Sequence, residues 1–134
     1  MKYDDQRFWT RQLMPIEASG GIDIPGTAAA ATVLIRLRIP RAITIDEATV
    51  VAMTGGTAAG PTLALQKSLA GTGAGTNFAT HNFGTAADNA SAALTVTSTD
   101  FAAGDHLLIT NLAGTAASSP NFNLILGWKE TFTG

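Results

Sequence analysis

The sequence predicts an all-β fold: an antiparallel, jelly-roll-like β-sandwich preceded by an extended N-terminal arm. Apolar residues alternate with polar ones in several short runs, as in strands that bury one face. Glycine, proline and asparagine separate these runs, and no segment shows the period of a helix. The last third has a polar turn, a strand, a loop of small residues and a longer closing strand, which is how jelly-roll sandwiches end.

The composition indicates one domain that is poor in charge. The chain has 134 residues, of which only 13% are charged, and its net charge of −2 gives no basic footprint for nucleic acid. The lack of cysteine excludes disulfides, thiol catalysis and cysteine zinc sites. We expect no secretory signal, because the first residues are charged. We also expect no transmembrane segment, because no apolar run approaches about 20 residues.

Residues 1–30 are predicted to form the arm, and residues 31–134 the sandwich. The arm contains glycine and small residues, and its apolar residues follow no regular period. Two alternatives stay open: the arm packs on its own domain, or it reaches a neighbouring subunit and becomes ordered there. The second alternative makes its apolar residues candidate anchors to a neighbouring protomer, since aromatic anchors dominate interfaces. These candidates are Phe8, Trp9, Leu13, Met14 and Ile16.

Strict alternation begins after residue 31. One face of this strand carries the apolar residues Val33, Ile35, Leu37 and Ile39, and the other carries two arginines. Pro40 ends the strand, because proline cannot donate to a β-ladder. Further strands are predicted around residues 43–45, 49–53, 63–69, 94–98, 107–109 and 122–128. Residues 70–92 are the least regular part and predict a long loop or a short strand between two loops.

Three arginines form a small basic stripe on this charge-poor domain: Arg36, Arg38 and Arg41. One interpretation is an ordinary solvated face. The alternative is a subunit interface in which the arginines contact acids such as Asp46 and Glu47, for which the guanidinium fork is well suited.

Candidate catalytic and metal-binding residues do not form a recognisable motif. His81 and His106 have no diagnostic metal-ligand spacing relative to Asp88, Asp100 or Asp105. Asp100 and Asp105 flank a turn and are expected to accept its backbone N–H groups. The glycine-rich residues 71–75 lack the ending of a phosphate loop, and no serine stands in a nucleophile elbow. We therefore expect neither an enzyme, nor a cofactor, nor a metal.

Three stretches together resemble the capsid decoration (cement) proteins of tailed bacteriophages. They are Ile39-Pro-Arg-Ala-Ile-Thr-Ile-Asp46, Asp100-Phe-Ala-Ala-Gly-Asp-His-Leu-Leu-Ile109 and the final Asn-Leu-Ile-Leu-Gly-Trp strand. The resemblance covers about residues 32–130. It implies a homotrimeric jelly-roll protein on the capsid surface of a virion assembled in the host cytoplasm. Its partner would be the major capsid protein, with no nucleic acid and no membrane involved. The resemblance also implies that the candidate anchors of the arm contact the capsid or an adjacent protomer.

Two other classes stay open. A phage tail-fibre or baseplate head would bind a host glycan through exposed loop residues, for example Phe78, His81 and Phe83 with Asp88. A trimeric signalling head of the C1q/TNF kind is a third possibility, against which the expected lack of a secretory signal counts.

Overall fold

The computed structural model describes residues 12–18, 21, 22, 24, 32–53, 62–70, 73, 75–84, 87–113 and 121–131. These residues form nine strands and no helix long and apolar enough to cross a membrane. The strands are β1 (Gln12–Ile16), β2 (Thr32–Arg38), β3 (Ile43–Ala52), β4 (Thr62–Ser68), β5 (Thr76–Asn82), β6 (Ala90–Ala93), β7 (Thr99–Phe101), β8 (His106–Ala113) and β9 (Phe122–Glu130).

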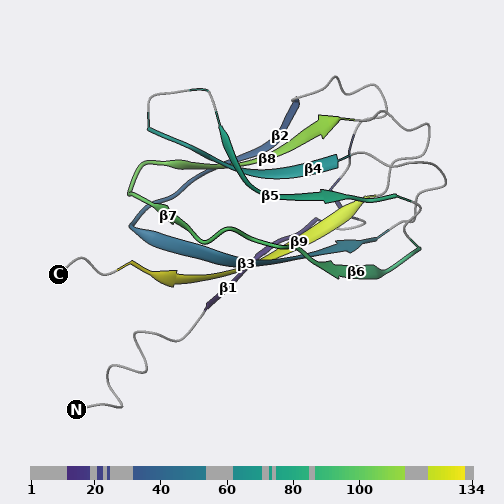
Figure 1. The fold of residues 1–134 in the computed structure, drawn as a ribbon. Helices are drawn as coiled ribbons and strands as arrows, with labels where there is room; N and C mark the ends of the chain where they lie inside the picture. Colours follow the sequence, from purple (N-terminus) through teal and green to yellow (C-terminus); the bar gives the residue numbers. More distant parts are fainter. Residues whose placement is uncertain are drawn as a thin grey trace, which may run out of the picture.

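The strands form two antiparallel sheets that lie face to face (Figure 1). Sheet A has the order β1-β9-β3-β6, with β7 also paired to β3, and sheet B has the order β2-β8-β4-β5. β6 and β7 pair with successive parts of β3 and act as one interrupted strand. Counted in this way, the order is that of an eight-stranded jelly roll. The predicted all-β sandwich is confirmed.

The core lies between the two sheets and consists of the inward side of every long strand. In sheet B, Ile35, Ile109 and Leu65 stand in one row across three strands. In sheet A, Leu126 pairs with Ala48 in the middle of the sheet. Leu65, Ile109 and Leu126 are each 0% exposed. Burial of one such side chain contributes about 1.5–3 kcal/mol, so these rows dominate the stability of the sandwich.

The sandwich includes residues that the sequence analysis placed in the arm. Gln12–Ile16 forms β1 at the edge of sheet A, where it pairs with β9, and Met14 and Ile16 pack against the core. Ile24 is also buried, at 3% exposure. The predicted arm of residues 1–30 is therefore wrong for Gln12–Ile16 and Ile24, which belong to the sandwich. Pro15 and the shortness of the strand conceal its alternation, and an edge strand tolerates proline.

Irregular pairing explains two further differences from the prediction. A register shift between Val33 and Ile35 turns Leu34 toward the core and leaves Val33 39% exposed, so Val33 does not share a face with Ile35. In the segment predicted as a long loop or a short strand, residues 76–82 form β5. A register shift opposite Phe78 disrupts its period of two.

The two ends of the sandwich differ in how the strands are connected. At one end, called the turn end, residues 39–42 and 102–105 make short links that bond to each other. There the Ile39 N–H donates to the Asp105 carbonyl and the Gly104 N–H to the Ile39 carbonyl, both at 2.8 Å. At the other end, called the loop end, β3, β5 and β8 finish at Ala52, Asn82 and Ala113, and longer connections follow (Figure 1).

Candidate functional site

Asp105 organises the turn end. Its carboxylate is 5% exposed and accepts the N–H groups of Ala102 at 2.9 Å and Ala70 at 3.3 Å. Gly104, with φ +96°, takes the left-handed position that this turn requires and that disfavours other residues. The prediction that Asp105 caps the turn is confirmed. Asp100 instead accepts the Thr44 hydroxyl at 2.6 Å.

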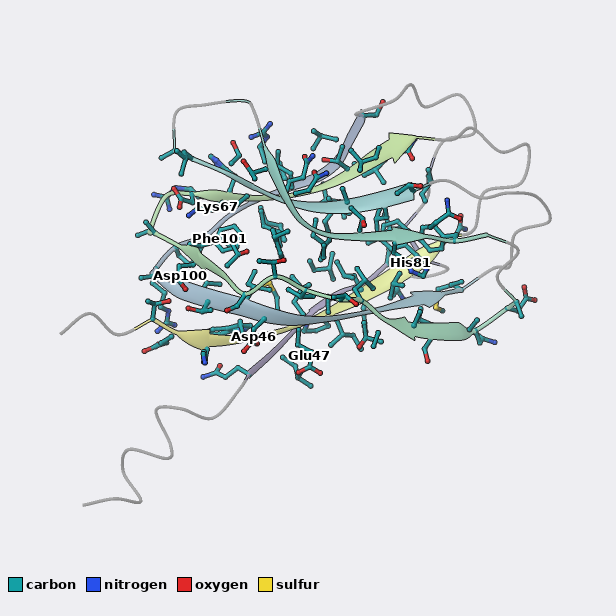
Figure 2. The ribbon with its side chains drawn as sticks, in the orientation of Figure 1. Asp46, Glu47, Lys67, His81, Asp100 and Phe101 are labelled. Carbon is teal, nitrogen blue, oxygen red and sulfur yellow. The ribbon has the colours of Figure 1, made fainter. Side chains whose placement is uncertain are left out.

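Lys67 joins the two sheets at the same end. Its ammonium group donates to the Asp100 carbonyl at 2.6 Å and lies 3.8 Å from the Asp105 carboxylate. It also lies 5.9 Å from the centre of the Phe101 ring, and Phe101 packs edge-on against Phe78. Figure 2 shows Lys67, Asp100 and Phe101 gathered between the sheets. These polar groups satisfy one another, so we interpret the cluster as a structural brace.

A cavity of about 170 Å³ lies near the loop end, where β5 and β6 form the last strands of the two sheets. Among the described residues, its lining is Val50, Ala52, His81, Phe83, Ala90, Ser91 and Ala92. His81 packs edge-on against Phe83, with ring centres 5.0 Å apart, and lies opposite the brace in Figure 2. Desolvation by burial lowers the pKa of His81 below its ordinary value, so the imidazole is biased toward its neutral form.

The candidate metal ligands do not come together. Within the described residues, no group of three or more histidine, aspartate or glutamate side chains is placed to hold a metal ion. His81 lines the cavity near the loop end, whereas His106 begins β8 at the turn end.

The outer face of sheet A carries an apolar row that the sequence analysis missed. Pro15, Ile125, Thr49 and Ala93 stand opposite one another across β1, β9, β3 and β6. Next to this row, Leu13 is 66% exposed. The solvent face of an antiparallel sheet normally carries polar residues. No stretch of sequence reveals the row, because each residue comes from a different strand.

The outer face of sheet B carries a chain of uncharged polar groups. Thr110 donates its hydroxyl to the Gln66 side chain at 2.8 Å, and Gln66 donates in turn to Asn77 at 2.7 Å. These bonds connect β8, β4 and β5. Sheet B also exposes an apolar side chain, Val33 at 39%, which is less exposed than Leu13 of sheet A at 66%.

The three arginines of the predicted interface divide into two groups. Arg36 and Arg38 are exposed on the outward side of β2. Arg41 lies in the link between β2 and β3 and forms a 2.6 Å ion pair with Glu130 of its own chain. Asp46 and Glu47 belong to β3 of sheet A (Figure 2), so the chain does not bring them to the exposed arginines of sheet B.

The predicted anchors of the arm also divide. Leu13 is exposed, and Met14 and Ile16 belong partly to the chain's own core. Phe8 and Trp9 lie outside the described residues.

The residues proposed for glycan binding do not form an exposed aromatic surface. Phe78 is 6% and Phe83 is 5% exposed, and both belong to the core. Asp88 lies in a turn before β6. Sugar recognition by stacking needs exposed rings. Because Phe78 and Phe83 are buried, neither ring is available to stack on a sugar.

Comparisons with family models, with curated proteins and with solved structures found no match for this chain.

Proposed function

We propose that this chain is a capsid decoration protein that stabilises a phage head by bridging neighbouring capsomers, and that it acts as a homotrimer. The observation that carries the proposal is the apolar row on the outer face of sheet A, Pro15–Ile125–Thr49–Ala93, with the exposed Leu13 beside it. A row of three apolar residues and one threonine on the outer face of a sheet is suited to contact another protein surface such as a capsid shell.

Two of the four sheet edges, β1 and β2, favour attachment through this face and not through strand addition. β1 ends sheet A and contains Pro15, and β2 ends sheet B and contains a register shift and two exposed arginines. Proline, bulges and charges are the devices that prevent one sheet edge from pairing with another. At these two edges a partner is therefore expected to contact side chains of the face and not the backbone of the edge strand.

The test is the binding of the full chain to empty, expanded shells of its phage, measured by co-sedimentation, with the mass of the free protein measured in solution. We expect a trimer that coats the shells. The double variant Leu13→Glu and Ala93→Glu places charges on the apolar face without disturbing the core. We expect it to bind at least about tenfold more weakly, because an interface charge without a partner is costly to desolvate.

The double variant Thr76→Glu and Thr80→Glu is the matched control, since both are exposed residues of sheet B, which we expect to face away from the shell. It should bind like the wild type. Equal loss in both variants would point to charge in general and contradict attachment through sheet A. A wild-type protein that ignores shells would overturn the proposed function.

A further inference from the structure

The cavity near the loop end has the size and lining of a receptor for a single side chain. Its volume of about 170 Å³ lies below the roughly 300–1,000 Å³ of typical small-molecule pockets. Three of the lining residues have small side chains, namely Ala52, Ala90 and Ala92, and the His81 imidazole adds one hydrogen-bonding group. Such a lining suits a side chain with an apolar body and one polar atom.

Tryptophan is the side chain that fits this description best, because its indole ring carries one N–H donor and it is a common anchor of interfaces. The chain contains two tryptophans. Trp128 belongs to β9 and packs against the core of its own chain. Trp9, which stands three residues before β1, is the other one.

Trp9 cannot reach the cavity of its own chain. β1 and β6 lie at opposite edges of sheet A, about 14 Å apart at about 4.8 Å per strand. Gln12 is level with Trp128 and Ile45, whereas the cavity is level with Val50, about 13–20 Å further along the strands. The direct path of about 20 Å crosses the protein. The three residue steps from Trp9 to Gln12 span at most about 11 Å.

We infer that the cavity receives Trp9 from a second copy of this chain, with the indole N–H directed to His81. This inference rests on the proposed function, because it supplies the contact by which the arm joins protomers. It concerns only contacts between copies, whereas attachment to the shell uses the outer face of sheet A.

Cross-linking tests the inference directly, since the chain has no cysteine of its own. Thr10→Cys protein is mixed with Ala90→Cys protein under mild oxidation, without shells, and the disulfide-linked peptides are identified by mass spectrometry. We expect a disulfide between position 10 of one copy and position 90 of another. Adding Trp9→Ala should reduce it about thirtyfold, as for the loss of an aromatic anchor.

Filling the cavity gives a second measurement. Ala92→Leu adds bulk on the cavity side of β6, and Ala103→Leu adds the same bulk at an exposed position of the turn before β8 as a matched control. We expect Ala92→Leu to remain folded and to associate about tenfold more weakly in solution. Ala103→Leu should associate like the wild type.

The outcomes separate this inference from the proposed function. A protein that coats shells but forms no disulfide between positions 10 and 90 overturns the inference alone. An intramolecular disulfide in the double variant Thr10→Cys/Ala90→Cys overturns it as well, because that variant would then place the arm on its own chain. Unchanged association of Ala92→Leu excludes the cavity as the receptor.

Discussion

The two ends of the sandwich use the same elements for different purposes. At each end a side chain of sheet B lies next to a pair of aromatic rings. Lys67 lies over Phe101, which packs against Phe78. His81 packs against Phe83, which contacts Phe122. Lys67 has a carbonyl, a carboxylate and an aromatic ring as partners. His81 has one ring contact and an adjoining cavity of about 170 Å³.

This difference indicates that the two ends of the sandwich have different roles. At the turn end, Lys67 lies close to Asp105 and the two links bond to each other, so these contacts help to hold the two sheets together. At the other end, small side chains border a cavity of about 170 Å³. Natural proteins commonly give up local stability where they bind, which is why the two ends should respond differently to mutation.

Truncation of the aromatic rings should give the largest difference between the ends. Phe101 is 1% exposed and closely packed, and Phe101→Ala is expected to lower the free energy of unfolding by about 4 kcal/mol. Phe83→Ala is expected to cost about 2–3 kcal/mol, because Phe83 already borders the cavity and has fewer contacts to lose. Urea unfolding of both variants measures the difference. Equal losses would contradict the unequal packing.

Removal of the turn-end carboxylate should have the next largest effect. Asp105→Ala leaves the Ala102 and Ala70 N–H groups without their acceptor and Lys67 without its nearby anion, at a cost of about 2–3 kcal/mol. Asp105→Asn keeps one acceptor for the Ala102 N–H and should cost only about 1 kcal/mol. Chemical denaturation of the two variants measures both values. If Asp105→Ala were neutral, the cluster would not be a brace.

Most of the strands could be predicted from the sequence, but the difference between the two ends could not. The strand beginning at Thr32 and the closing strand were predicted because alternation is written in consecutive residues. β1 was missed because Pro15 interrupts it, and β5 was left open because the register shift near Phe78 disrupts its period. The turn chemistry of Asp105 could be predicted because its carboxylate accepts the N–H of Ala102, which is close in sequence, whereas its bond to the distant Ala70 could not.

The sites formed by distant residues were not readable in the same way. Lys67 meets Asp100 because β4 of one sheet lies near β7 of the other, and it meets Asp105 because β4 pairs with β8. The cavity and the apolar row each combine side chains from at least three strands, and their existence depends on strand order and register. Strand order and register cannot be predicted from a local sequence pattern. Each contributing residue, seen in its own strand, is of a common type and gives no sign of the site.

The smallest predicted effect is the pH dependence that His81 confers. Burial lowers its folded-state pKa, so the unfolded chain binds more protons when the pH falls below about 6.5. The contribution of His81 to stability is therefore complete above that pH and is lost as the pH falls toward the folded-state pKa. Its described neighbours in the cavity carry no other titratable group, so desolvation is not compensated there.

His81→Phe keeps the ring contact with Phe83 but cannot be protonated, and it should lose less stability than the wild type between about pH 7 and pH 5. Urea unfolding at the two pH values measures this difference, and parallel losses in the two proteins would show that the buried imidazole does not carry it.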